Sequence, residues 1–121
     1  MLKKRLNSFR YAFTGIATMF RSEPNAKIHL TIAVVVLAAG FFLQITAMEW
    51  CIVILCMAAV LAAEAFNTAI EQLTDLVSPD FHPLAKKAKD LAAGAVLIAA
   101  GGAVAVGVIV FLPKLLKIIA L

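Results

Sequence analysis

Charged residues are scarce in this sequence of 121 residues: Asp, Glu, Lys and Arg make up 15%, whereas a typical soluble domain has about a quarter. Hydrophobic residues make up 64%, and the mean hydropathy is +1.01. A water-soluble chain this short could not bury so much apolar surface. The composition therefore excludes an ordinary soluble domain and indicates a single domain, residues 1–121, with lipid as its main solvent.

Motifs that would indicate other functions are absent. The two cysteines, Cys51 and Cys56, lie inside an apolar run without the paired spacing of a zinc site. No Gly-x-x-x-x-Gly-Lys-Ser/Thr pattern exists, so any nucleotide would bind without a P-loop. The net charge of +4 comes from residues between the apolar runs, which favours lipid headgroups over nucleic acid as the partner. Because the first long apolar run begins only near Ile28, we expect no cleavable signal peptide.

Three apolar stretches predict membrane spans, each of which needs about 20 residues. Residues 28–48 and 91–112 contain no Lys, Arg, Asp or Glu. Between them, residues 50–63 are apolar but too few to cross, so the second helix must continue through Glu64. The sequence therefore predicts an all-α membrane protein whose second span covers residues 50–70.

Basic residues predict the orientation of these spans. Most of them precede the first span or lie between the second and third: they are Lys3, Lys4, Arg5, Arg10, Arg21, Lys27, Lys86, Lys87 and Lys89. The remaining two, Lys114 and Lys117, follow the third span. By the positive-inside rule, we expect a cytosolic N-terminus and an external C-terminus.

The N-terminal segment, residues 4–21, is predicted to form an amphipathic helix. Its apolar residues recur at steps of three and four and so share one face, with basic residues beside it. This stripe consists of Leu6, Phe9, Phe13, Ile16 and Phe20. Pro24 is expected to end the helix before the first span. The stripe can lie on the cytosolic membrane surface, pack against the rest of the chain, or do both.

A polar face interrupts the second span. At about 100° per residue, the side chains of Glu64, Asn67, Glu71 and Asp75 fall within an arc of roughly 80° on an otherwise apolar helix. If Trp50 marks the outer interface, Glu64 lies about 21 Å further along a helix that crosses a core about 30 Å thick. We therefore expect Glu64 just below the cytosolic surface and Glu71 at that surface.

That placement suits a reaction between a lipid and a water-soluble reagent. A lipid hydroxyl can reach Glu64 from the bilayer, where the carboxylate can act as a general base. A polar cosubstrate can reach Glu71 and Asp75 from the cytosol, and Glu71 can hold a hard cation such as Mg²⁺. Lys89 can neutralise phosphate oxygens or simply anchor the third span. The alternative is a stripe that only joins helices, but a charged residue at mid-depth costs about 2.5–3.5 kcal/mol.

These residues form part of a longer motif. Glu64-x-x-Asn67-Thr68-Ala69-Ile70-Glu71-x-x-x-Asp75 is followed by His-Pro-Leu-Ala-Lys at 82–86 and Ala-Lys-Asp at 88–90. Phe-Arg-Tyr-Ala at 9–12 and Glu-Pro-Asn at 23–25 extend the motif toward the N-terminus. Over nearly its whole length, the chain resembles the bacterial diacylglycerol kinase and undecaprenol kinase family.

The resemblance implies a homotrimeric kinase of the bacterial cytoplasmic membrane, with active sites shared between subunits. Such a kinase transfers the γ-phosphoryl group of Mg-ATP to a lipid alcohol. The resemblance makes Glu64 the general base, Asn67 and Asp75 residues that orient the base or substrate, and Glu23 and Glu71 ligands of Mg²⁺. The implied nucleotide-binding residues are Tyr11, Glu23, Glu71, Asp80, Phe81, His82, Lys89 and Asp90, and Lys4 or Arg5 would touch phosphate or substrate.

The family divides by lipid substrate. Residues 83–85, the Ala-rich start of the third span and residues 111–114 are more similar to undecaprenol kinases, and Ala93 departs from diacylglycerol kinases, which often have a polar residue there. We therefore expect undecaprenol, with diacylglycerol as the alternative. Two other classes are a proton or cation conduit, which would place acids through the membrane depth, and a non-catalytic assembly subunit.

Overall fold

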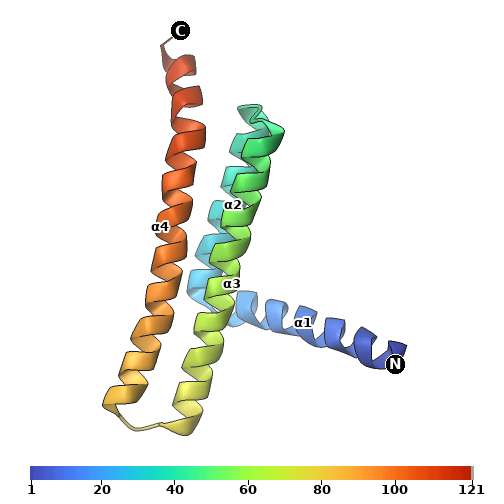
Figure 1. The fold of residues 1–121 in the computed structure, drawn as a ribbon, viewed down its shortest axis with the longest axis vertical. Helices are drawn as coiled ribbons and strands as arrows, with labels where there is room; N and C mark the ends of the chain where they lie inside the picture. Colours follow the sequence, from blue (N-terminus) through green and yellow to red (C-terminus); the bar gives the residue numbers. More distant parts are fainter. Residues whose placement is uncertain (121) are drawn as a thin grey trace.

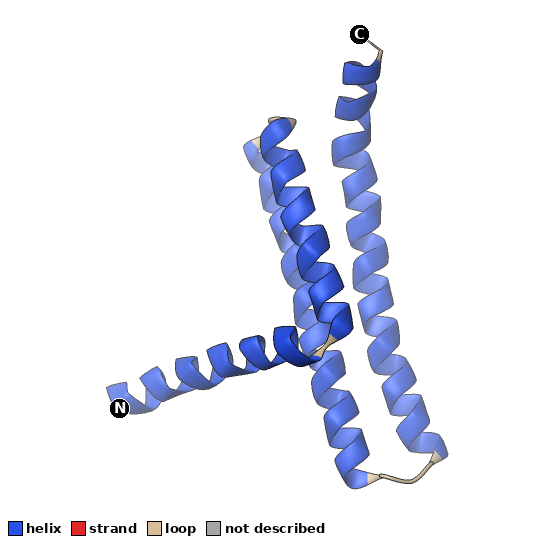
Figure 2. Cartoon of the chain, turned by 180° about the vertical axis from the view of Figure 1, so that it is seen from behind, coloured by secondary structure: helices blue, strands red, loops and turns tan. Residues whose placement is uncertain are grey.

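The computed structural model describes residues 1–120, which form four α-helices (Figure 1). The helices are α1 (Leu2–Ser22), α2 (Pro24–Phe42), α3 (Ala47–Val77) and α4 (Pro83–Ile119). Figures 1 and 2 show α2, α3 and α4 side by side, with α1 projecting sideways from them. No strand occurs within the described residues, so the predicted all-α class is confirmed.

The helices α2, α3 and α4 are each long and apolar enough to cross a membrane, which confirms three candidate spans. The first differs from its predicted bounds of 28–48, because α2 runs from Pro24 to Phe42. A turn at residues 43–46 then reverses the chain: Gln44 has a φ of 51°, and the Ile45 N–H donates to the Gly40 carbonyl at 3.2 Å. We call this end of the molecule the turn end.

The other two spanning helices are longer than predicted. With 31 and 37 residues, α3 and α4 measure roughly 46 and 55 Å, which exceeds the bilayer core of about 30 Å. The predicted spans of 50–70 and 91–112 lie inside α3 and α4, and the helices continue beyond them because the flanking Glu, Gln, Lys and Leu residues also favour helix. A loop at residues 78–82 joins α3 to α4 (Figure 2), and we call this the loop end.

The boundary between α1 and α2 lies where the proline predicted it. Pro24 occupies the first turn of α2, and Glu23 is extended between the two helices. The predicted apolar stripe of α1 remains largely uncovered, since Phe9 and Phe13 are 66% and 69% exposed. Only Met19, close to α2 and α3, is buried on this helix. Packing on the rest of the chain is therefore limited to the end of α1, and the stripe is free to meet lipid.

Packing is concentrated between α3 and α4, which run antiparallel. The buried apolar core lies toward the turn end, where Ile45, Val53 and Val110 pack together. On the half of α3 toward the loop end, the buried side chains include polar ones. The fold thus places its apolar core and its polar face at opposite ends of the same helix pair.

Candidate active site

The predicted polar face of α3 is buried only in part: Glu64 and Asn67 are buried, Glu71 is half-buried and Asp75 is exposed. Glu64 is 1% exposed, Asn67 7% and Thr68 8%. Hydrogen bonds satisfy only some of the polar atoms of Asn67 and Thr68. The Asn67 Nδ2 donates to Glu71 Oε1 at 3.3 Å, which links two of the predicted residues one turn apart. The Asn67 Oδ1 and the Thr68 hydroxyl are buried without a hydrogen-bond partner. Such unpaired buried groups cost stability, and these two atoms remain available to accept or donate a hydrogen bond.

Glu64 also contacts a side chain of α2, that of His29. The Nε2 atom of His29 lies 3.7 Å from Glu64 Oε2. Glu71 joins this face through its hydrogen bond with Asn67, and Glu23 lies at the junction of α1 and α2. The negative charges of Glu23 and Glu71, the two predicted metal ligands, both act on Glu64, the predicted general base.

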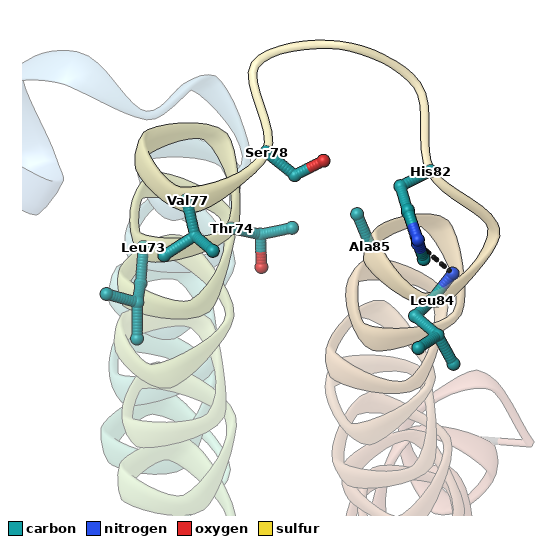
Figure 3. A pocket seen from close by; sticks show the side chains of 7 residues that line it. All are labelled: Leu73, Thr74, Val77, Ser78, His82, Leu84 and Ala85. Atoms are coloured by element: carbon teal, nitrogen blue, oxygen red, sulfur yellow. Dashed lines mark hydrogen bonds between the residues drawn. The ribbon is translucent and has the colours of Figure 1, made fainter.

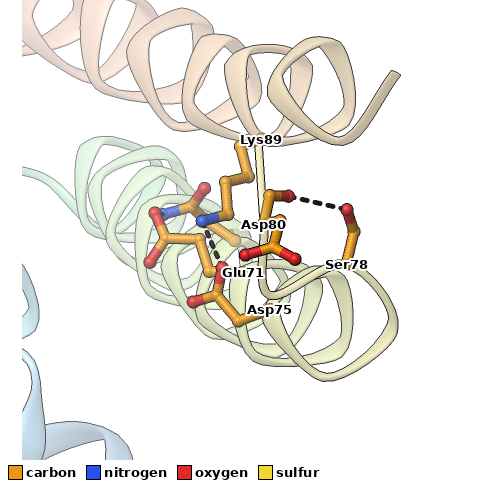
Figure 4. A network of polar contacts seen from close by, with 6 residues as sticks. Glu71, Asp75, Ser78, Asp80 and Lys89 are labelled. Carbon is orange, nitrogen blue, oxygen red and sulfur yellow. Dashed lines mark hydrogen bonds and ion pairs between the residues drawn. The ribbon is translucent and has the colours of Figure 1, made fainter. Parts of the chain in front are cut away.

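Lys89 of α4 also contacts the polar face of α3. Figure 4 shows its side chain reaching across to α3, where its ammonium pairs with the Asp75 carboxylate. Glu71 lies beside this pair, and the Ser78 hydroxyl donates to the Asp80 carbonyl at 2.9 Å in the adjoining loop. A cation and several carboxylates are thus held together at the loop end, a charge arrangement that suits a phosphate with its metal ion.

Two cavities open at the loop end. One, of about 360 Å³, contains four of the eight predicted nucleotide-binding residues, Asp80, Phe81, His82 and Lys89. It is lined by Asp75, Ser78, Pro79, Asp80, Phe81, His82, Ala85, Lys86 and Lys89. The other, of about 470 Å³, is drawn in Figure 3 and is lined by Leu73, Thr74, Val77, Ser78, His82, Leu84 and Ala85. His82 contributes to both cavities, and its Nδ1 accepts from the Leu84 N–H at 3.1 Å, which caps α4.

Two predicted nucleotide-binding residues, Tyr11 and Asp90, lie apart from both the cavity of about 360 Å³ and the polar face of α3. Tyr11 is 71% exposed on α1, which projects away from the loop end (Figure 1). Asp90 pairs with Lys86 on its own helix and lines a separate cavity with Lys87. Lys4 and Arg5 are also exposed on α1.

The residues present fit Mg²⁺ only as part of a larger ligand set. Within residues 1–120, no three His, Cys, Asp or Glu side chains are arranged to hold a metal by themselves. Glu23 and Glu71 offer carboxylate oxygens, and the orphaned Asn67 Oδ1 lies beside Glu71. Mg²⁺ commonly takes one or two protein carboxylates and completes its octahedron with phosphate and water. This donor set therefore suits a metal that arrives with a nucleotide.

Two residues of the site were missed in the sequence. His29 was given no role from the sequence, because its contact with Glu64 depends on how α2 rotates against α3. Thr68 was quoted in the motif but given no role, although at about 100° per residue it lies only about 40° from Glu64. The helical periodicity could have included Thr68 in the polar face.

Comparison with known proteins assigns the chain to a family. Residues 10–111 match the family described as prokaryotic diacylglycerol kinase. An undecaprenol kinase of Bacillus subtilis is 41% identical over 114 residues, covering 94% of this chain and 93% of that protein. A diacylglycerol kinase of Synechocystis is 43% identical over 93% of this chain, but this match covers only 65% of that protein.

A third relative is also named as a lipid kinase. A diacylglycerol kinase of Pseudomonas aeruginosa is 34% identical over 98 residues, which cover 81% of this chain and 80% of that protein. The matches include the polar face of α3, the loop end and the three candidate spans. The chain therefore belongs to the prokaryotic diacylglycerol kinase family and is a multi-pass bacterial membrane protein with lipid kinase activity.

Proposed function

We propose that this lipid kinase transfers the γ-phosphoryl group of Mg-ATP to undecaprenol, with Glu64 as the general base. The observation that carries the proposal is the position of Glu64, which is buried beside the acidic residues Glu23 and Glu71. A base in that place can meet a lipid hydroxyl on one side and a phosphate donor on the other. The Bacillus subtilis relative named undecaprenol kinase supports this choice of lipid.

The reaction can be written with the residues of this chain. The lipid hydroxyl oxygen attacks the γ-phosphorus, its O–H proton passes to the Glu64 carboxylate, and the bond from the γ-phosphorus to the β,γ-bridging oxygen breaks to release ADP. Lys89 neutralises phosphate oxygens, and Asn67 and Asp75 orient the reacting groups. Mg²⁺ held by Glu23 and Glu71 would offset the negative charge of the phosphates.

The nucleotide is assigned to the loop end. The cavity of about 360 Å³ contains Asp80, Phe81, His82 and Lys89, and it adjoins the polar face through Asp75. The chain has no P-loop pattern, and Lys86 and Lys89 are the basic side chains that line this cavity. Asp90 lies one residue after Lys89 and reaches the nucleotide if it leaves its pair with Lys86.

A neighbouring subunit completes the site in this proposal. Tyr11 and the basic start of α1 lie on a helix that projects away from the chain's own loop end. A homotrimer with shared sites brings these residues to the nucleotide of another chain. The exposed apolar stripe of α1 then rests on the cytosolic surface, with the loop end cytosolic and the C-terminus outside.

The lipid choice has a specific alternative, because two of the relatives compared above are named diacylglycerol kinase. The test uses purified protein in mixed micelles, with γ-labelled ATP and equal mole fractions of undecaprenol or a diacylglycerol. We expect the higher kcat/KM with undecaprenol. A higher value with diacylglycerol overturns the lipid assignment, and no labelled lipid in either case overturns the kinase proposal.

A further inference from the structure

His29 is the basic residue that contacts the buried carboxylate of Glu64. Its Nε2 lies 3.7 Å from Glu64 Oε2, which is close enough for an ion pair but longer than a direct hydrogen bond. The Glu64 side chain is 2% exposed, whereas that of His29 is 21% exposed. Within the described residues 1–120, no other basic side chain pairs with Glu64.

The other charges near Glu64 have the same sign as its carboxylate. Glu23 approaches from the junction of α1 and α2, and Glu71 from the next turns of α3. On α4, Lys89 pairs with Asp75 and Lys86 with Asp90, so these cations are engaged toward the loop end. A buried charge without a compensating partner is strongly unfavourable. His29 is therefore the one basic side chain placed against Glu64 among these acids.

Apolar residues surround the other side of His29. His29 lines a cavity of about 120 Å³ together with Ile32, Val36, Val60 and Val104. Water has few polar partners in such a space. Because the Glu64 side chain is only 2% exposed, the imidazole rather than solvent is the group that faces its carboxylate.

We propose that His29 is a positioning residue that orients the Glu64 carboxylate and balances its charge for proton abstraction from the lipid hydroxyl. This role rests on the proposed function, in which Glu64 accepts that proton as the O–P bond forms. His29 itself touches neither the nucleotide nor the transferred phosphoryl group. Its effect must therefore appear in kcat and depend on the presence of the Glu64 carboxylate.

The test replaces the imidazole in two ways. His29→Gln keeps a polar side chain of similar size without a positive charge, and His29→Lys supplies a charge in another shape. In mixed micelles with undecaprenol, we expect His29→Gln to lower kcat at least about tenfold, with KM for Mg-ATP unchanged within about twofold. His29→Lys should recover most of the lost kcat. Thr31→Val is the matched control, because this exposed hydroxyl on α2 bonds only its own helix at the Lys27 carbonyl.

A double-mutant cycle separates positioning from an indirect structural effect. In the Glu64→Gln background, the carboxylate is gone, so adding His29→Gln should change the residual kcat by less than about twofold. Equal factors in both backgrounds, a wild-type kcat for His29→Gln, or a Lys variant as slow as the Gln variant would each overturn the proposal. Wild-type turnover in Glu64→Gln alone instead refutes the proposed base, so the two failures are distinguishable.

Discussion

The two ends of the helix bundle satisfy their polar groups in different ways. At the turn end, the Thr46 N–H donates to Glu49 Oε2 at 2.8 Å, and the Glu49 N–H donates to Thr46 Oγ1 at 3.2 Å, which forms a capping box. Glu49 also pairs with Lys114 of α4 at 3.2 Å. These contacts and the buried core join α2, α3 and α4 at this end.

Toward the loop end, polar groups are buried without full compensation. The Asn67 Oδ1 and the Thr68 hydroxyl lack partners, and Glu64 is near two other acids. Two cavities open at the loop between α3 and α4. Both ends carry acidic residues, but Glu49 Oε2 is held by the Thr46 N–H and the Lys114 ammonium, whereas Asn67 and Thr68 on the face of Glu64 leave atoms available for ligands.

The largest expected difference between the two ends is in kcat, when one carboxylate is removed from each end in turn. Glu64→Gln keeps the size of the side chain but removes the proton acceptor, so kcat should fall about 10²–10⁴-fold while Mg-ATP still binds. The measurement is single-turnover phosphorylation of lipid in micelles, together with Mg-ATP titration. Glu49→Gln is the control: turnover should stay near wild type, with only a modest loss of thermal stability. A Glu64→Gln enzyme with wild-type kcat would remove the distinction between the two acids.

The sequence predicted what depends on one helix at a time. Apolar runs identified the three spanning helices, Pro24 located the junction between α1 and α2, and periodicity placed Glu64 and Asn67 on a buried face. The contact of His29 with Glu64 could not be predicted, since it depends on the relative rotation of two helices. The same holds for the approach of Lys89 to Asp75 across the loop.

One error at the turn end was avoidable. The Thr-x-x-Glu signature at residues 46–49 marks a helix start, yet the first span was extended through it to Met48. Tyr11 is a different case, because it is 71% exposed on α1, which projects sideways from the other helices. A residue that would act on another subunit cannot be placed from the sequence or fold of a single chain.

A glycine at the turn end allows a close approach that should matter for stability. A Cβ atom on Gly40 would lie 2.6 Å from Trp50 Cη2 and 3.2 Å from Ile45 Cδ1. Gly40→Ala therefore forces the indole to move, and we expect a loss of about 1–3 kcal/mol, measured as a lower midpoint of thermal unfolding in detergent. Gly15→Ala on α1 meets no atom within 4 Å, so it should be neutral or stabilising. Equal midpoints for the two variants would argue against tight packing at this end.

At the other end, Glu71 should affect cosubstrate binding rather than folding. Glu71→Ala removes a carboxylate assigned to Mg²⁺, and we expect KM for Mg-ATP to rise roughly tenfold, equal to about 1.4 kcal/mol. Glu71→Gln is the matched variant, because its amide oxygen can still accept from Asn67 Nδ2 at the position of Glu71 Oε1. Both variants should weaken Mg-ATP binding alike. If Gln behaves as wild type and Ala does not, the hydrogen bond with Asn67 is the important property and the metal role is refuted.

The smallest effect should come from Thr68, and it tests whether an unpaired buried group serves a ligand. Thr68→Val keeps the branched shape and removes a hydroxyl that has no hydrogen-bond partner. Stability should stay the same or rise, because no bond is lost and a desolvated polar group is removed. If the hydroxyl binds substrate or orients Glu64, kcat/KM for the lipid should fall about three- to tenfold, as expected for one hydrogen bond of roughly 0.5–1.5 kcal/mol. Higher stability with lower kcat/KM would show that the loop end retains an unsatisfied group for function, whereas unchanged kcat/KM would leave Thr68 outside the site.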